Sequence, residues 1–126
     1  MNHATAKNSL NTLTDLQVGN RSYGYHSLPR AARQLGDLEQ LPFSLKVLLE
    51  NLLRHEDDET VSRAHLDAMA AWLDYNRSDT EIQFRPARVL MQDFTGVPAV
   101  VDLAAMRDAI ISLGGDADKI NPLNPV

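Results

Sequence analysis

Residues 84–103 read FRPARVLMQDFTGVPAVVDL, and this stretch decides the fold because it joins three kinds of local structure. The apolar run Val89–Met91 predicts a short strand that ends in the polar pair Gln92-Asp93. A turn is expected at Thr95-Gly96, and Pro98 suits the first turn of the helix that follows. Polar side chains at the end of a strand are where α/β folds often place ligand groups. The stretch therefore predicts an α/β fold, or a mixed α+β fold.

The main core helix is expected just upstream, in residues 41–54, which read LPFSLKVLLENLLR. Its leucines recur at spacings of three and four, as in an amphipathic helix with a wide apolar stripe. They are Leu45, Leu48, Leu49, Leu52 and Leu53. We expect this helix to form the centre of the hydrophobic core.

Shorter patterns fill the N-terminal part of the chain. Residues 1–12 are expected to form a flexible tail, and residues 13–126 to form the N-terminal portion of one domain. Gly19-Asn20 suits the tight turn of a β-hairpin with strands at 13–18 and 21–27. A short helix over 29–35 should end at Gly36.

The C-terminal part alternates strand and helix signals. A helix capped by Thr60 or Ser62 should carry the apolar period through Leu73. Short strands are predicted over 81–84 and 87–91, interrupted at Pro86, which cannot donate to a ladder. A long helix from Pro98 should end at Gly114-Gly115, and two prolines keep residues 121–126 extended.

Composition narrows the class of protein. The chain has 126 residues, 44% of them hydrophobic and 23% charged, which is typical of a soluble globular domain. Its formal net charge of −5 disfavours autonomous nucleic-acid binding. No secretory leader or membrane-spanning run is evident, so we expect a cytoplasmic protein without membrane contact. The sequence holds no cysteine, so thiolate ligation of iron or zinc within it is excluded.

Gln92 is the candidate binding residue. Its amide offers two donors and one acceptor oxygen, so it can bind a hydroxyl or carboxylate without a change of charge. Asp93 could be a second ligand group, but a cap for the following turn is favoured. Thr95 and Gly96 are expected to support the loop that presents Gln92.

Other polar clusters have a structural interpretation that is favoured over a functional one. The acidic run His55–Glu59 could be a hard-metal site, but it lacks EF-hand spacing and is expected to be a solvated turn between helices. Arg85 and Arg88 could clamp a carboxylate, although a surface or interface pair is favoured. No nucleophile elbow, triad or phosphate loop is present. The remaining histidines are scattered without metal-ligand spacing, namely His3, His26 and His65.

Several separated blocks resemble the aconitase family, in its aconitate hydratase A and iron-regulatory-protein branch. They are residues 41–54, 84–103, AAMRDA at 104–109, GGD at 114–116 and KINPL at 119–123. The resemblance covers residue 41 to the C-terminus and is weaker before it. Enzymes of this family are several times longer, so the match implies the N-terminal part of the first domain.

The resemblance implies an N-terminal fragment of an aconitate hydratase, a hydro-lyase of the tricarboxylic acid cycle that interconverts citrate and isocitrate through cis-aconitate. The family uses a [4Fe-4S] cluster, which this chain is not expected to bind, and its matching glutamine, here Gln92, binds substrate. The family's cluster cysteines, Asp-His pair, catalytic serine and substrate arginines are not matched here, so we expect no catalytic or metal-ligating residue in this chain. The fragment alone is expected to be inactive.

The implied partners are citrate or isocitrate through the complete enzyme, and the remainder of the aconitase chain. RNA binding would belong only to the full-length, cluster-free form. Apolar surface left uncovered in a fragment predicts self-association. The alternative hypothesis is a stand-alone, non-catalytic binding or interaction domain that keeps the aconitase N-terminal fold.

Overall fold

The computed structural model describes residues 6–91 and 97–126. The chain divides into two compact units, Met1–Arg85 and Pro86–Val126. Its described elements are a two-stranded hairpin followed by helices, which confirms the mixed α and β composition predicted from the sequence. Among the described residues, no helix is both long and apolar enough to span a bilayer.

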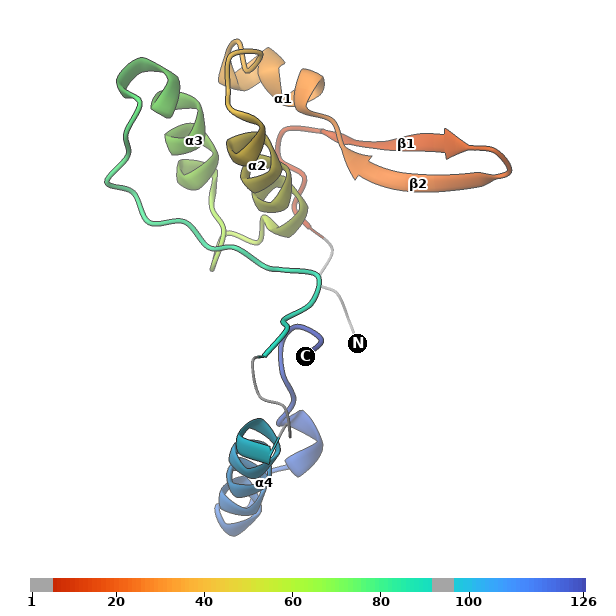
Figure 1. Cartoon of the computed structure of the whole chain (residues 1–126), viewed down its shortest axis with the longest axis vertical. Helices are drawn as coiled ribbons and strands as arrows, with labels where there is room; N and C mark the ends of the chain where they lie inside the picture. The colour runs from red at the N-terminus through yellow and green to blue at the C-terminus, as the bar shows by residue number, and fades with distance from the viewer. Residues whose placement is uncertain (1–5, 92–96) are drawn as a thin grey trace. The chain divides into compact units, whose positions relative to one another are not determined.

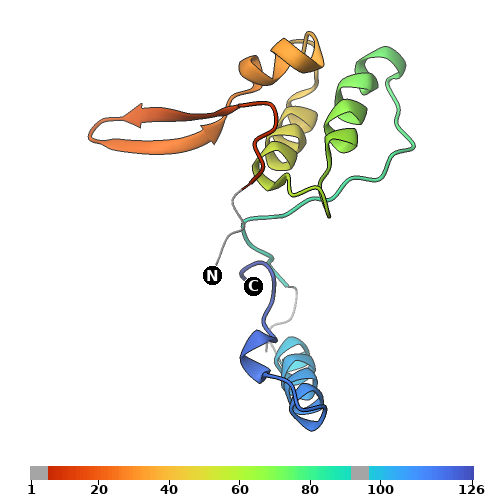
Figure 2. The same ribbon diagram turned by 180° about the vertical axis from the view of Figure 1, so that it is seen from behind.

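The first unit opens with the predicted hairpin. Strand β1 (Leu13–Val18) pairs with β2 (Arg21–His26) in antiparallel register, with Leu16 opposite Tyr23. Gly19 has a φ of 58°, a value that favours glycine, at the turn between the strands. Both views show the β1–β2 hairpin extending away from the helices of its unit (Figures 1 and 2). Most of its residues are therefore exposed.

Three helices form the core of the first unit, and their limits follow the local signals. Helix α1 (Leu28–Leu35) has Ser27 at its N-cap and ends at Gly36, where φ is 94°. Helix α2 (Phe43–His55) packs beside α3 (Arg63–Tyr75), as both views show (Figures 1 and 2). The buried core contains three of the five predicted leucines of α2, together with residues from α1, α3 and the loops; Leu45 and Leu48 are partly buried and pack against it. Its members are Leu10, Ala31, Leu38, Leu41, Leu49, Leu52, Leu53, Val61, Leu66 and Met69.

The described part of the expected N-terminal tail, residues 6–12, lies against this core. Leu10 and Thr12 are buried, and the Lys7 N–H donates to the Glu56 carbonyl at 2.8 Å. The Glu56 carboxylate, also buried, accepts from the Ser9 N–H at 2.9 Å and from its hydroxyl at 2.6 Å. The packed part of the first unit therefore includes residues that precede residue 13.

The second unit is built on α4 (Val97–Ser112) and a short 3-10 helix, η1 (Ala117–Lys119). Helix α4 ends where the glycine pair predicts, because the Gly115 N–H returns to the Ile110 carbonyl and Gly114 has a φ of 78°. Residues 121–126 are non-helical, as their prolines predict. None of the described residues of this unit is buried.

The strands predicted over 81–84 and 87–91 are wrong for the described residues, because the sheet contains β1 and β2 alone. Their apolar pattern is typical of a strand, but a strand also needs a neighbour to complete its ladder. The described backbone of 87–91 makes one such bond, from the Val89 N–H to the Pro125 carbonyl at 2.8 Å. The described residues of both segments are therefore irregular, without a ladder.

Candidate functional site

The candidate residue Gln92 lies outside the described residues, as do Asp93, Thr95 and Gly96. Their described neighbours are Met91, which precedes them in a non-helical segment, and Val97, the first residue of α4. The role of Gln92 in ligand binding therefore stays a prediction.

Within the second unit, the described chain has a non-helical segment at 86–91, then α4, and then a second non-helical segment at 120–126. The hydrogen bond from the Val89 N–H to the Pro125 carbonyl joins the two non-helical segments. Arg107 of α4 holds the second one, since its Nε donates to the Ile120 carbonyl at 3.1 Å and its Nη2 to Asn121 Oδ1 at 2.8 Å.

The exposed surface of α4 is apolar on several sides. Its exposed side chains include Val97, Val100, Val101, Met106 and Ile111. A helix that is hydrophobic all round is normally buried on several sides in a globular protein. The 41 residues of this unit bury no described side chain of their own, and so small a unit rarely builds a stable core.

Arg85, one of the two arginines considered as a carboxylate clamp, is engaged in structure instead. Its Nη2 lies 3.0 Å from Asp57 Oδ2 and 2.6 Å from Thr60 Oγ1. Its backbone N–H donates to Asn51 Oδ1 at 3.0 Å, and its carbonyl accepts from Asn51 Nδ2 at 2.8 Å. Arg88 is exposed and makes no ion pair with the described residues. The contacts of Arg85 therefore favour its structural role over a carboxylate clamp.

The acidic run after α2 forms the predicted turn. Asp57 Oδ1 accepts hydrogen bonds from the backbone N–H groups of Glu59, Thr60 and Val61 at 3.0, 2.8 and 2.9 Å. These bonds, led by that from Val61, together with the Thr60 hydroxyl, hold the pKa of Asp57 well below its usual range. Among the described residues, no group of three or more metal-ligating side chains gathers here or elsewhere. The prediction of a solvated turn is wrong for Glu56, which is buried.

The described histidines have structural roles that their spacing did not reveal. His26 is buried, and its Nδ1 lies 2.9 Å from Thr12 Oγ1. Burial lowers the pKa of His26, and the nearby Glu50 carboxylate opposes that effect. His65 accepts the Ser62 N–H at 3.1 Å and so helps to begin α3. His3 lies outside the described residues.

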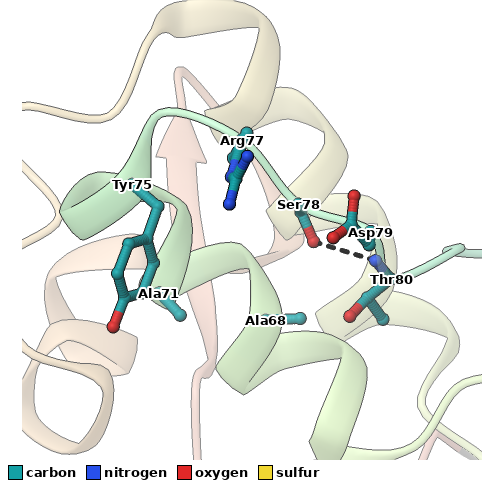
Figure 3. Close-up of a pocket in the computed structure, with 7 residues that line it drawn as sticks. All are labelled: Ala68, Ala71, Tyr75, Arg77, Ser78, Asp79 and Thr80. Atoms are coloured by element: carbon teal, nitrogen blue, oxygen red, sulfur yellow. Dashed lines mark hydrogen bonds between the residues drawn. The ribbon is translucent and has the colours of Figure 1, made fainter.

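A pocket of about 370 Å³ lies beside the end of α3, and Tyr75 and Arg77 are among the residues that line it (Figure 3). The Thr80 N–H donates to Ser78 Oγ at 3.1 Å on its far wall. Arg77 and Asp79 give the lining opposite charges, so it offers no concentration of positive charge for a polycarboxylate. The pocket contains no residue that the sequence singled out. It is lined by Ala68, Ala71, Tyr75, Arg77, Ser78, Asp79 and Thr80.

The described elements define the class as a mixed α and β protein, and comparison with known proteins identifies the family. The model of the aconitase family (aconitate hydratase) matches residues 59–126. Aconitate hydratase A of Pseudomonas aeruginosa is 67% identical over 121 residues, which are 96% of this chain and 13% of the relative. The proteins of the same name from Salmonella typhimurium and Escherichia coli are 62% and 61% identical over 111 residues, 88% of this chain and 12% of each relative.

The chain therefore belongs to the aconitase family. It spans about 13% of the length of the Pseudomonas relative that it matches.

Proposed function

We propose that this chain is the N-terminal part of an aconitate hydratase and that it is catalytically inactive alone. The observation that carries the proposal is the 67% identity over 121 residues to an aconitate hydratase A of which this chain covers 13%. The second unit supports it, because its apolar helix α4 has no described buried side chain. We propose that the remaining aconitase polypeptide covers this surface.

The substrates of the complete enzyme are citrate and isocitrate, and Gln92 is the residue of this chain that binds them. A glutamine amide can donate to a carboxylate and accept from a hydroxyl, and both groups occur on these substrates. Gln92 also precedes the amino-terminal end of α4 by five positions, where backbone N–H groups favour anions. Its role is to bind and orient the substrate, with no proton transfer.

A [4Fe-4S] cluster belongs to the proposed complete enzyme, but the residues of this chain do not fit it. Such clusters are held by cysteine thiolates, and the sequence contains none. Its described acidic and histidine side chains form no group of three that could hold a metal ion. Cluster ligation and the catalytic groups are therefore assigned to the rest of the polypeptide, and no chemical step is assigned to this chain.

Two further parts of the proposal concern location and partners. We assign the complete enzyme to the cytoplasm. We also propose that the isolated chain self-associates, because the exposed apolar side chains of the chain include those of α4 and the hairpin. RNA binding is not assigned to this chain, whose formal net charge is −5.

The test is steady-state kinetics of Gln92→Ala in the complete polypeptide that contains this sequence. We expect kcat/KM for citrate to fall by about 10- to 100-fold, with the melting temperature unchanged. Gln83→Ala is the matched control, because Gln83 is an exposed glutamine nearby in the sequence. Equal kcat/KM values for Gln92→Ala and the parent would remove Gln92 from the site.

A further inference from the structure

The β1–β2 hairpin has one apolar face and one polar face. Side chains alternate between the two faces of a strand, and residues paired across the ladder share a face. The face defined by the pair of Leu16 and Tyr23 carries large apolar and aromatic side chains, and we call it the apolar face. It consists of Leu16, Val18, Tyr23 and Tyr25, with Thr14 and Arg21 beside them. The opposite face consists of Asp15, Gln17, Ser22 and Gly24, with Leu13 and His26 at the base of the hairpin.

The apolar face is left uncovered in the first unit. Its four large side chains are between 38% and 55% exposed, and both views show the hairpin projecting from the helices (Figures 1 and 2). Residues 14–25 form no hydrogen bond or ion pair with the described residues of the first unit outside the hairpin. A two-stranded hairpin alone is marginally stable in water, and its apolar face normally packs against another layer. The described first unit does not supply that layer.

The base of the hairpin, in contrast, is held by three hydrogen bonds to neighbouring elements. The Leu13 N–H donates to Asn8 Oδ1 at 3.2 Å, and the Leu13 carbonyl accepts from Arg30 Nη1 at 3.1 Å. On the other strand, the His26 N–H donates to Glu50 Oε1 at 3.4 Å. Both strands are thus fixed where they leave the helices. A preorganised arm loses less conformational freedom when it docks, so this anchoring favours binding through the apolar face.

We propose that the apolar face of the hairpin docks against an apolar surface in the part of the aconitase polypeptide that lies outside residues 1–126. The inference rests on the proposed function, since it requires the longer polypeptide. This chain covers 13% of the Pseudomonas relative, so most of the proposed polypeptide is available to supply the partner surface. Tyr23 and Tyr25 indicate its chemistry, because a tyrosine ring packs on apolar groups while its hydroxyl binds a polar group. The partner surface is therefore apolar, with hydrogen-bonding groups at its edge.

The small size of the apolar face favours a partner surface in the same polypeptide over a second copy of the protein. Stable interfaces between separate proteins involve about 20–30 residues on each side. The hairpin has two strands of six residues, and alternate residues of each strand lie on the apolar face. Within one polypeptide, the covalent connection raises the effective concentration of the partner surface, so a small contact is sufficient.

Photo-cross-linking in the complete polypeptide identifies what covers the apolar face. The photoreactive residue p-benzoylphenylalanine replaces Tyr23, and in a matched control it replaces Ser22 on the opposite face. Peptide mass spectrometry locates the cross-links, and a mixture of isotopically labelled and unlabelled copies separates links within one polypeptide from links between two. We expect the Tyr23 probe to react with a peptide of the same polypeptide outside residues 1–126, in much higher yield than the Ser22 probe. Cross-links between two copies, cross-links confined to residues 1–126, or equal yields from the two probes would overturn the inference.

Limited proteolysis gives a second measurement that needs no probe. Leu16→Glu places a charge on the apolar face, whereas Gln17→Glu places the same charge on the opposite face, and neither adds a tryptic site. We expect trypsin to cleave the complete polypeptide after Arg21 about tenfold faster in Leu16→Glu than in Gln17→Glu, because the charge opposes docking of the hairpin. Equal cleavage rates would contradict the inference.

The outcomes separate this inference from the proposed function, because the same preparations are assayed for interconversion of citrate and isocitrate. An active enzyme whose apolar face forms no such cross-link overturns the docking of the hairpin and leaves the proposed function intact. A native protein of 14.0 kDa alone would overturn both.

Discussion

Asn51 and Arg85 are 34 positions apart in the sequence, yet the amide of one forms two hydrogen bonds with the backbone of the other. The contact attaches the segment after α3 to α2, and Ile82 of the same segment packs against the core. The Asn51 side chain satisfies the backbone of Arg85, so this end of residues 77–85 is held without a strand ladder.

This contact predicts a measurable loss of stability. Asn51→Leu should lower the free energy of unfolding of the chain by about 1–3 kcal/mol, since it leaves the Arg85 N–H and carbonyl without their partner. Urea denaturation followed by circular dichroism measures the change. Gln83→Leu, at an exposed position, should change the same quantity by less than about 0.5 kcal/mol. Equal effects of the two substitutions would mean that the Asn51 contact contributes nothing.

Because the buried Glu56 carboxylate binds Ser9, we predict that removing this carboxylate detaches the N-terminal segment from the core. Glu56→Ala should cost about 1–3 kcal/mol, because the Ser9 N–H and hydroxyl lose their acceptor. Limited proteolysis should then cleave near residues 6–12 much faster than in the parent chain. Glu59→Ala, at an exposed position in the same turn, is the control. Unchanged cleavage in Glu56→Ala would contradict the proposed anchor.

The pKa values of His26 and Asp57 predict loss of stability on acidification. Both pKa values are lowered in the folded chain, so the unfolded chain binds more protons as the pH falls. Stability should begin to fall below the ordinary His pKa of about 6.5, and to fall again below the ordinary Asp pKa of about 3.9. Urea midpoints from pH 8 to pH 3 measure this profile. His26→Gln should remove the first decline, and a decline of the same size in that variant would refute the assignment.

Exposed apolar side chains predict that the isolated chain self-associates. Replacing Val101 and Met106 on α4 by lysine should shift the chain towards monomer, because the substitutions remove apolar surface and add charge. Ser112→Lys adds a charge to the same helix without removing apolar surface and should have a smaller effect. Sedimentation velocity across a range of concentrations makes the comparison. A parent chain that stays monomeric at high concentration would argue against the prediction.

Local signals explain which parts of the fold could be predicted. The leucine period of α2, Gly36 after α1 and Gly19 in the hairpin turn each act within a few residues, and each corresponds to an observed element or boundary. The strands over 81–91 failed because a strand depends on a partner that no local pattern reveals.

The long-range contacts of the first unit were less predictable. The attachment of Asn51 to Arg85 and the burial of Glu56 join positions far apart in the sequence, which periodicity does not report. The spacing of Asp57 and Thr60 did carry a signal, because an Asp that binds N–H groups a few positions later is typical of turns. The choice of Gln92 came from its place after an apolar run and from the family resemblance.

The mass of the native protein that carries this sequence tests the central claim most directly. An antibody raised against the 14.0 kDa chain is used on a size-fractionated cell extract, and each fraction is assayed for interconversion of citrate and isocitrate. We predict one reactive species several times larger than 14.0 kDa that co-fractionates with the activity. A reactive species of 14.0 kDa alone, separated from the activity, would contradict the account and favour a free-standing, non-catalytic domain.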